Sequence, residues 1–488
     1  MSMAKHDNKA AASVGDIVTA AVTDMSTSGE GIGHVDGYTL FIKDAVIGDT
    51  VEARLTMTKK NYGYAEVTAL IEPSPDRVEP RCPLSGRCGG CTLQSLSYPA
   101  QLRYKKAQVE NDLRRIGGLD VPVNDVIGME DPWRYRNKSQ YPVGWRENAA
   151  KEREPVCGYY AGRSHRIIPV KDCLISGESD ADITRTVLDY MREYGITPYD
   201  EASGRGEVRH ILIRRGRATG EVMVCLIVTE DGRKIGGHLA GRLCEAVPGF
   251  KSLCLNINNR RDNVILGDEV VPVYGDPFIY DKIGGLTFRI SPLSFYQVNP
   301  TQTKKLYDTV RTFAGLTGQE TVLDLYCGIG TIGLYLADGA KDLYGVEIVP
   351  EAIRDAKENA VRNGITNAHF AVGASEDIFK DLPDADVVIL DPPRKGCDEA
   401  LLDGLIERSP MRIVYVSCNP ATLARDLKRL TEGGYCVEAV QPCDMFPASL
   451  HIEVVSLLQK MSNTRERTIT LDVEMEDYYR LKNETEKA

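Results

Sequence analysis

The pattern of apolar and polar positions changes twice along the chain. From residue 14 to 72, short runs alternate apolar and polar residues, and glycine-rich turns such as Gly29–Gly33 separate them. Alternation with a period of two predicts half-buried strands, and short strands with frequent turns are typical of a small barrel or sandwich. The proline-rich stretch at 73–80 indicates a linker.

The middle of the chain, from about 135 to 290, contains apolar runs of strand length, including RHILIRRG, EVMVCLIVTE and SLCLNINN. These runs predict an antiparallel sheet with at least one hairpin. A separate helix is predicted over 98–117, where Gly117 and Gly118 supply the stop. This part of the chain therefore combines helix and sheet.

After about residue 300, short and almost wholly apolar strands alternate with helices. The strands are TVLDLYCG, DLYGVEI, ADVVILDPPR and MRIVYVSCNP. Pro350 suits the first turn of the helix that follows the second strand, and Gly364 suits its end. Strands without a polar side are covered on both faces, so we expect a parallel sheet with flanking helices.

Length and composition narrow the class of protein. The chain has 488 residues, which is too long for one core, so about two to four domains are expected. No apolar run is long enough to cross a bilayer, and the N-terminal residues lack the apolar segment of a secretory signal. We therefore expect a cytoplasmic protein. Its thirteen cysteines favour metal binding or catalysis for a few and burial for most.

The net charge of −11 does not indicate a nucleic-acid-binding protein, but the charge is unevenly distributed. Between Arg81 and Lys171 there are 16 Lys and Arg residues against 9 Asp and Glu residues. This basic region is either a phosphate-binding surface or a chance cluster on a solvated face. Arg134, Arg136 and Lys138 are interleaved with aromatic residues, and they are candidates for phosphate contacts or for ordinary ion pairs.

A glycine-rich run, LDLYCGIGTIG at 323–333, follows a strand and opens a helix. Its glycines allow the backbone to turn tightly and to approach a ligand. Glu347 ends the next strand, where a carboxylate can accept both ribose hydroxyls. The third glycine is displaced from the dinucleotide-binding pattern and Asp324 precedes the loop, so a nucleoside without phosphates fits better. The alternative is a purely structural turn.

A thiol and two carboxylates lie at or near the ends of other predicted strands. Asp391 and Cys418 each come directly after an apolar strand, and Glu453 interrupts an apolar segment. A thiol, a base and a nucleoside cofactor fit methyl transfer to carbon 5 of a pyrimidine. A thiolate adds to carbon 6 and makes carbon 5 nucleophilic, and a base then removes the carbon 5 proton. The alternatives are an inert buried cysteine and a salt-bridged glutamate.

A cysteine cluster, CPLSGRCGGC, places Cys82, Cys88 and Cys91 within ten residues. Three clustered thiolates need a fourth ligand, and Cys157 and Cys173 are the nearest in sequence. The spacing lacks the paired knuckles of most zinc sites, which favours an iron–sulfur cluster over structural zinc. A metal-free site is the third possibility.

Several motifs, in this order along the chain, resemble those of one known family. They are TSGEGIGHVDGYTLFIKDAVIGDTV, CPLSGRCGGC, DCLI, SFYQVNP, LDLYCGIGTIG, DPPRKG, VSCNP and HIEVV, and the resemblance covers about residues 10–460. The chain resembles the bacterial 23S rRNA (uracil-C5)-methyltransferases, which use S-adenosylmethionine.

The resemblance implies a fold of the α/β plus β class, with an N-terminal TRAM (OB-like) β-barrel, a central α+β iron–sulfur and RNA-binding domain and a Rossmann-like class I methyltransferase domain. The implied limits are 10–73 for the barrel, 74–290 for the central domain, 291–460 for the methyltransferase domain and 461–488 for a polar tail. The helix near 101–117 is expected to pack on the catalytic domain despite its early position.

The same resemblance implies roles for individual residues. Cys418 matches the nucleophile and Glu453 the proton acceptor. The residues that match S-adenosylmethionine contacts are Gln297, Tyr326, Glu347 and Asp391. The residues that match the ligands of a [4Fe–4S] cluster are Cys82, Cys88, Cys91 and Cys173. In this comparison Cys173, and not Cys157, is the fourth ligand.

The expected function is methyl transfer from S-adenosylmethionine to carbon 5 of a uridine in 23S rRNA. The TRAM-like segment and the cysteine cluster favour ribosomal RNA, because the transfer RNA branch of the family lacks both. Two alternatives stay open. One is a transfer RNA uridine methyltransferase with extra modules, and the other is an iron–sulfur RNA-binding protein whose methyltransferase domain is idle. Neither a membrane nor an obligate protein partner is expected.

Overall fold

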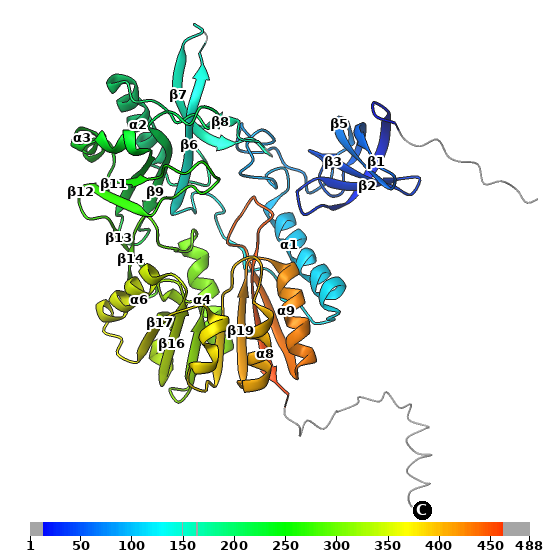
Figure 1. The fold of residues 1–488 in the computed structure, drawn as a ribbon. Helices are drawn as coiled ribbons and strands as arrows, with labels where there is room; N and C mark the ends of the chain where they lie inside the picture. Colours follow the sequence, from blue (N-terminus) through cyan, green and yellow to red (C-terminus); the bar gives the residue numbers. More distant parts are fainter. Residues whose placement is uncertain (1–12, 149, 163, 462–488) are drawn as a thin grey trace, which may run out of the picture.

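The computed structural model describes residues 13–148, 150–162 and 164–461. Its strands form a closed barrel, two seven-stranded sheets and a two-stranded hairpin. Figure 1 shows the barrel to one side, with the sheet of the central unit above the sheet of the C-terminal unit. Residues 10–12 of the predicted barrel and 462–488 of the predicted tail lie outside the described residues.

The N-terminal barrel follows the predicted alternation, and its spatial order is β1-β2-β3-β5-β4. Its strands are β1 Ile17–Met25, β2 Gly31–Val35, β3 Tyr38–Lys43, β4 Thr50–Thr58 and β5 Tyr62–Glu72. The prediction of a turn over Gly29–Gly33 is wrong in part, because Gly31 already begins β2. A Cβ at Gly31 would lie only 2.7 Å from Val22 Cγ1. This glycine therefore serves close packing inside the barrel and not a turn.

The central unit is a seven-stranded sheet in the spatial order β12-β11-β10-β9-β6-β7-β8. Its strands are β6 Lys138–Glu147, β7 Arg153–Tyr160, β8 Ile167–Pro169, β9 Val208–Arg215, β10 Val222–Val228, β11 Phe250–Ile257 and β12 Glu269–Tyr274. The predicted antiparallel arrangement is wrong for one pair, because β10 and β11 run parallel. Helix α3 (Gly237–Ala246) supplies the crossover that a parallel pair requires. With α2 (Asp180–Tyr194), it packs on one face of the sheet.

The C-terminal unit is a seven-stranded sheet in the spatial order β17-β16-β15-β18-β19-β21-β20. Its strands are β15 Thr321–Leu325, β16 Asp342–Glu347, β17 Ala368–Val372, β18 Val387–Leu390, β19 Arg412–Ser417, β20 Tyr435–Cys443 and β21 Glu453–Lys460. The first five run parallel, as predicted, and β21 is antiparallel to both of its neighbours. The strand order reverses beside β15, and open α/β sheets bind their ligands at such a point.

Helices cover both faces of the C-terminal sheet (Figure 1). They are α4 Pro300–Ala314, α5 Thr331–Leu336, α6 Pro350–Arg362, α7 Ser375–Ile378, α8 Glu399–Arg408 and α9 Pro420–Glu432. As predicted, Pro350 stands in the first turn of α6 and Gly364 follows its end with φ +66°. Neighbouring residues of β19 enter opposite cores, Val414 one and Tyr415 the other. Within the described ranges, no helix combines the length and the apolar character that crossing a membrane requires.

A hairpin connects the central unit to the C-terminal unit. It consists of β13 (Ile279–Ile283) and β14 (Leu286–Ile290). The Arg289 N–H donates to Asn359 Oδ1 of α6 at 2.9 Å. Apolar side chains of the hairpin, of one face of the central sheet and of the C-terminal sheet form one cluster. The two units therefore share a continuous core.

Helix α1 (Tyr98–Asp112) comes early in the chain but packs on the C-terminal unit, beside α9 (Figure 1). It continues into a π-helical turn, and Val109 contributes to the core under α9. Lys105 Nζ lies 2.6 Å from Asp444 Oδ1, and both side chains are fully buried. Lys105 also donates to the Phe446 carbonyl oxygen at 3.0 Å. Burial lowers the pKa of Lys105, and the Asp444 carboxylate opposes that shift.

We expect Lys105→Met to lower the free energy of unfolding by about 3–5 kcal/mol, because it leaves the Asp444 carboxylate buried without its ion-pair partner. Urea unfolding of the full chain measures the effect. The matched control is Lys106→Met on the same helix, whose ion pair with Asp125 lies at the surface and should contribute little. Equal losses in the two variants would show that the buried pair is not an anchor.

Candidate active site

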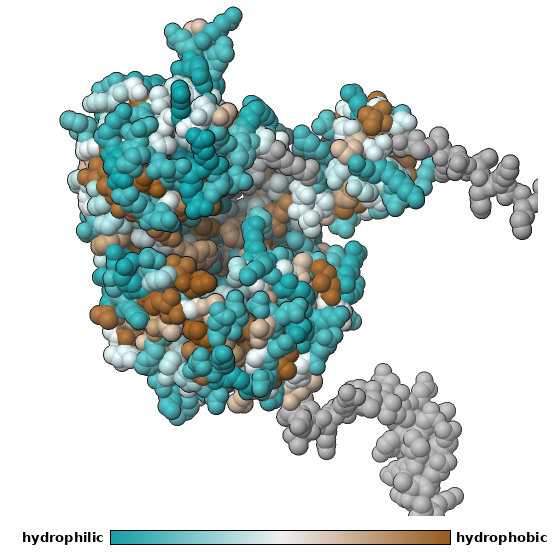
Figure 2. Space-filling model, in the orientation of Figure 1, coloured by the Kyte–Doolittle hydropathy of each residue, from teal (hydrophilic) through white to brown (hydrophobic). Residues whose placement is uncertain are grey.

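Four of the predicted site residues lie at the carboxyl ends of neighbouring parallel strands. Tyr326 follows β15, Glu347 ends β16, Asp391 follows β18 and Cys418 follows β19. The strands are paired up to these ends, so the four residues meet at one edge of the sheet. Figure 2 shows that the molecular surface is hollowed between the central and C-terminal units.

The loop after β15 has the shape of a ligand cradle. Tyr326, Gly328 and Gly330 have φ of +67°, +56° and +79°. The Gly328 N–H donates to Glu347 Oε2 at 3.2 Å, and the Val349 N–H donates to Glu347 Oε1 at 3.0 Å. A Cβ at Gly328 would meet no atom within 4 Å. The backbone is therefore open to a close ligand, and the Glu347 carboxylate is held beside it.

Asp324 is a further buried acid of this site. The sequence indicated it only as a departure from a glycine pattern. Its Oδ2 accepts from the Gly333 N–H at 2.8 Å, and its Oδ1 has no hydrogen-bond partner within the described residues. Burial raises the pKa of Asp324 to about 7, the Gly333 hydrogen bond opposes the rise, and the charges of Asp391 and Glu347 add to it. A polar or positively charged ligand atom would satisfy the remaining oxygen.

Cys418 lies half-buried among charged groups. Burial raises the pKa of its thiol to about 11. The charges of Glu453 and Asp391 contribute to this rise, and the Arg394 guanidinium opposes it. With a pKa of about 11, this thiol is largely protonated at neutral pH in the free protein. The thiolate, which is the nucleophilic form of a cysteine, is therefore the minor species.

Glu453 begins β21 and is paired across the ladder with Cys443 of β20. Its side chain is only 5% exposed. Burial raises the pKa of Glu453 well above its usual range, and the charge of Asp391 adds to the rise. Burial likewise raises the pKa of Asp391 to about 7. A carboxylate with a raised pKa is a stronger base once it has lost its proton.

Arg394 is held over this edge by its backbone. Its carbonyl oxygen accepts from Asn419 Nδ2 at 3.0 Å and from Thr422 Oγ1 at 3.2 Å. Asn419 also caps α9 by accepting from the Ala421 N–H at 3.2 Å. The exposed Arg394 side chain forms no ion pair with any described residue. Its guanidinium lies near Cys418 and lowers the pKa of that thiol.

Gln297 lies in the segment before α4 and is 6% exposed. Asn137 of the central unit donates from Nδ2 to the Gln297 carbonyl oxygen at 2.9 Å, and its N–H donates to the Val298 carbonyl oxygen at 2.9 Å. The central unit thus fixes the position of the segment that carries Gln297.

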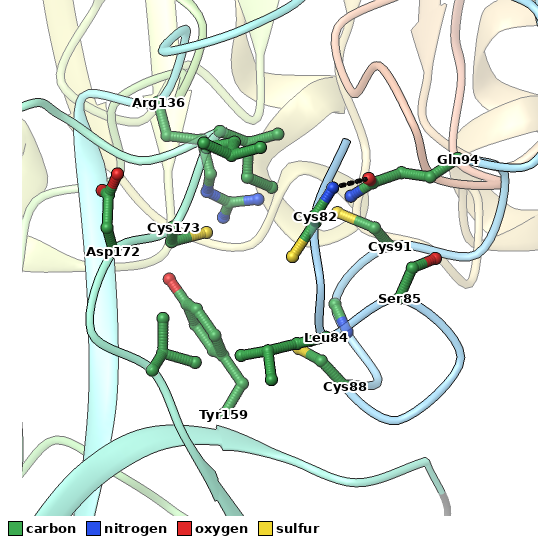
Figure 3. Close-up of a pocket in the computed structure, with 14 residues that line it drawn as sticks. Cys82, Leu84, Ser85, Cys88, Cys91, Gln94, Arg136, Tyr159, Asp172 and Cys173 are labelled. Carbon is green, nitrogen blue, oxygen red and sulfur yellow. Dashed lines mark hydrogen bonds between the residues drawn. The ribbon is translucent and has the colours of Figure 1, made fainter. Parts of the chain in front are cut away.

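The four predicted cluster ligands line one cavity of about 110 Å³ (Figure 3). Cys82, Cys88 and Cys91 come from one segment, and Cys173 comes from another. Burial raises the pKa of Cys91 to about 11, and the other three thiols add to the rise. Cys157 is buried in the core of the central unit instead. In the described part of the chain, no group of three or more Cys, His, Asp or Glu side chains has the spacing of a metal site.

The predicted phosphate contacts have different environments. Arg134 is an ion-pair partner, with Nη2 2.5 Å from Asp172 Oδ2, and it donates to the Cys173 carbonyl oxygen at 2.9 Å. It therefore fixes the Cys173 loop. Arg136 lines both the cysteine cavity and a neighbouring pocket of about 480 Å³. Burial lowers the pKa of Lys138 to about 8, and nearby arginines add to the shift.

The loop between β20 and β21 leads to Glu453 and is held by the N-terminal half of the chain. Ala448 has φ +64°, its N–H donates to Gln101 Oε1 at 3.0 Å, and its carbonyl oxygen accepts from the Thr92 and Leu93 N–H groups at 3.0 Å. A non-glycine residue in this conformation persists only where its surroundings enforce it. No local sequence signal predicts these contacts, because Gln101 and Ala448 are 347 positions apart.

Two family models match the chain. The model described as tRNA (Uracil-5-)-methyltransferase matches residues 268–461, and the TRAM domain model matches residues 11–68. The first match contains β15 to β21 and the edge described above, and the second contains nearly the whole barrel.

Relatives and a solved structure extend the similarity to most of the chain. A protein of Halalkalibacterium halodurans described as an RNA methyltransferase is 51% identical, over 91% of this chain and 97% of its own length. A protein of Bacillus cereus with the same description is 45% identical over 91% and 97%. The Pyrococcus abyssi tRNA (uracil-54, C5)-methyltransferase, solved with S-adenosyl-L-homocysteine, is 27% identical with a TM-score of 0.73. The match covers 90% of this chain and all of that one.

The charges around Cys418 predict opposite shifts of its pKa in two variants. Glu453→Gln removes a negative neighbour and should lower the pKa of the thiol, whereas Arg394→Gln removes a positive neighbour and should raise it. The rate of Cys418 alkylation by iodoacetamide against pH, followed by peptide mass spectrometry, measures both shifts. Glu351→Gln, an exposed acid of α6, is the control and should leave the profile unchanged. Identical midpoints in all three variants would contradict this electrostatic account.

Proposed function

The chain belongs to the RNA (uracil-5-)-methyltransferase family, and we propose that it methylates carbon 5 of a uridine in 23S rRNA. The observation that carries this proposal is that Asp391 after β18, Cys418 after β19 and Glu453 at the start of β21 lie at one edge of the sheet. A thiol with a carboxyl base beside it is what addition to carbon 6 and removal of the carbon 5 proton require.

The proposed reaction assigns one step to each residue. The Cys418 thiolate adds to carbon 6 of the uracil, and carbon 5 becomes nucleophilic. S-adenosylmethionine, when bound, would supply the electrophilic methyl group to carbon 5, and the electron pair of the broken sulfur–methyl bond would stay on the neutral thioether that leaves. Glu453 then accepts the proton from carbon 5, the electron pair re-forms the ring double bond, and the sulfur leaves carbon 6 as a thiolate. Arg394 is placed to donate to a uracil carbonyl oxygen, where negative charge develops.

The residues at the cradle fit S-adenosylmethionine. Glu347 would accept from the ribose hydroxyls, and Tyr326 and Gln297 would flank the ligand. Asp324 is buried and Asp391 is half-buried in an acid-rich environment, and desolvation raises the pKa of both. A sulfonium cation would relieve that crowding of negative charge. This acid-rich donor set favours a positively charged cofactor over a phosphate-bearing one.

Ribosomal RNA is the proposed substrate, and transfer RNA is the second candidate. The solved Pyrococcus abyssi neighbour acts on uracil 54 of tRNA and aligns with 90% of this chain. The presence of modules beyond the catalytic unit therefore does not separate the two substrates. The resemblance of the whole ordered series of motifs to the 23S branch supports ribosomal RNA, and we propose that the protein acts in the cytoplasm. We propose domain limits of 10–73 for the barrel, 74–290 for the central domain and 291–460 for the methyltransferase domain.

We also propose that the cysteine cavity holds a [4Fe–4S] cluster, with Cys82, Cys88, Cys91 and Cys173 as ligands. Four thiols face one cavity, and the Gly90 N–H donates to Cys88 Sγ at 3.4 Å, as amides do to cluster sulfurs. Ligation would require the Cys82–Cys91 segment to close on Cys173. A cluster there would supply positive charge to thiolates that burial disfavours.

Two variants should separate the steps at the active edge. We expect Cys418→Ala to lower methyl transfer by at least ~10³-fold while S-adenosylmethionine binding persists. Glu453→Gln should trap a covalent RNA–protein adduct that survives denaturing electrophoresis, because the carbon 5 proton is no longer removed. The assay uses 23S rRNA fragments and transfer RNA transcripts side by side. Methylation of the transfer RNA alone would replace the proposed substrate, and rapid product release by Glu453→Gln would refute the base.

The cluster is tested by metal content. We expect Cys173→Ser to lose iron and the absorbance of an iron–sulfur cluster in anaerobically purified protein. Cys157→Ala is the matched control and should keep both, because Cys157 lies outside the cavity. Elemental analysis that finds zinc and no iron in the unmodified protein purified anaerobically would overturn the cluster.

A further inference from the structure

Helix α9 begins just after Cys418, and its first two turns bind the loop that follows β18. Two side chains at the start of the helix donate to the Arg394 carbonyl oxygen. Further along the helix, Arg425 Nη2 donates to the Lys395 carbonyl oxygen at 2.9 Å. The loop that carries Arg394 is therefore attached at several points to the helix that follows the sulfur.

Asp426 is the buried centre of this attachment, and its side chain is fully enclosed. Its Oδ2 accepts from the Cys397 N–H at 2.8 Å and from the Tyr415 hydroxyl at 2.6 Å. Its Oδ1 accepts from Arg425 Nε at 2.8 Å. Donors of this kind offset the cost of burying a carboxylate. One carboxylate thus joins the end of the loop, strand β19 and helix α9.

The backbone of the loop is shaped to reach Asp426. The Gly396 N–H donates to the Pro393 carbonyl oxygen at 2.8 Å, and Gly396 has φ +81°. A Cβ at Gly396 would lie only 2.5 Å from Asp426 Oδ2 and 2.5 Å from Arg425 Nη2. The glycine is therefore needed both for the turn and for the close approach of the carboxylate.

The place of Arg394 matters because of the charges that act on Cys418. Two of them are the acids Glu453, at the start of β21, and Asp391, in the same loop as Arg394. Arg394 is the cation that opposes them, and its side chain is a hydrogen-bonding neighbour of the thiol. This side chain is exposed and is held through its backbone, so a shift of the loop would move the guanidinium away from the sulfur.

We propose that Asp426 is a positioning residue, which fixes the loop 391–397 on α9 so that the Arg394 guanidinium stays beside the Cys418 sulfur. The donors to Asp426 are groups of this chain, so the carboxylate acts through the loop and not by touching a substrate. An interaction between charges weakens with distance, so a small displacement is enough to change it. This role rests on the proposed function, because it takes Cys418 to be the nucleophile.

The experiment follows alkylation of Cys418 by iodoacetamide against pH in the full chain, with peptide mass spectrometry as the readout. Asp426→Asn removes a negative charge, so direct electrostatics alone would lower the pKa of the thiol. An amide, however, offers one acceptor oxygen to three donors, and the loop should shift. We therefore expect the pKa to rise and the alkylation rate near about pH 8 to fall by about threefold or more.

The matched control for this variant is Asp403→Asn. Asp403 is an exposed acid of α8 whose Oδ1 lies 2.7 Å from Arg429 Nη2 of α9. It is thus also a carboxylate paired with an arginine of the same helix, but it lies away from the loop 391–397. The alkylation profile of Cys418 should be unchanged in this variant.

Gly396→Ala tests the same contact without any change of charge. The added methyl group would push against the Asp426 carboxylate, so we expect the pKa of the thiol to rise, as in Asp426→Asn. Gly364→Ala is its matched control. Gly364 also has a positive φ, of +66°, but a Cβ there would meet no atom within 4 Å. The control therefore introduces similar backbone strain and should leave the alkylation profile unchanged.

A double-mutant cycle shows whether Asp426 acts through Arg394. In an Arg394→Gln background the guanidinium is already absent, so Asp426→Asn should no longer raise the pKa of the thiol. An equal rise in both backgrounds, or a lowered or unchanged pKa in folded Asp426→Asn, would overturn the inference. Circular dichroism shows whether that variant folds. If it does not, Gly396→Ala decides, and a profile equal to that of Gly364→Ala would overturn the inference.

These measurements require neither RNA nor S-adenosylmethionine, so they are independent of methyl transfer. A chain that shows the expected shifts but forms no 5-methyluridine would overturn the proposed function alone. A chain that methylates RNA, while Asp426→Asn leaves the pKa of the Cys418 thiol unchanged, would overturn the positioning role alone.

Discussion

The constraint on which the rest of the site depends is the crowding of acids at the carboxyl edge of one sheet. Parallel strands bring their carboxyl ends to the same side, so Glu347, Asp391 and Cys418 lie along one edge of the sheet. Burial raises the pKa of Asp391 and of Asp324 to about 7. At Cys418, burial also raises the pKa of the thiol, and the exposed Arg394 guanidinium opposes that rise. Such an edge favours a cationic ligand and disfavours a diphosphate.

The edge is completed by parts of the chain far away in sequence. Glu453 arrives on the antiparallel strand β21, after a loop whose residue Ala448 is bonded on both sides by the N-terminal half. The buried pair of Lys105 and Asp444 anchors the start of the same loop. The segment that carries Cys91 therefore also holds the loop that leads to Glu453. A cysteine-rich segment can act on a catalytic unit in this way through backbone contacts alone.

The sequence predicts those features that depend on neighbouring residues and misses those that depend on contacts between distant residues. Periodicity predicted the barrel strands and the parallel sheet. Each pattern, alternate apolar residues in the barrel and continuous apolar runs in the sheet, can be recognised within a few consecutive residues. It misassigned Gly31 to a turn, although this glycine allows close packing inside the barrel. It also predicted the wrong relative direction for β10 and β11, because their parallel direction depends on the helix that connects them. Strand-end positions predicted which side chains meet at the edge. The Lys105–Asp444 pair joins residues 339 positions apart, so no short sequence pattern predicts it.

The raised pKa of the Cys418 thiol fits an enzyme whose nucleophile is formed only with its substrate. In the free protein, burial is the largest cause of the raised pKa, and a thiol with a pKa of about 11 is largely protonated at neutral pH. Under the proposed function, a bound sulfonium would add positive charge to the same acid-rich edge, and a uracil carbonyl oxygen near Arg394 would carry the developing negative charge. Both changes favour the thiolate. In the proposed reaction, the reactivity of the sulfur would thus depend on ligand binding at this edge, and the acids that raise the pKa of the free thiol would also attract the cation.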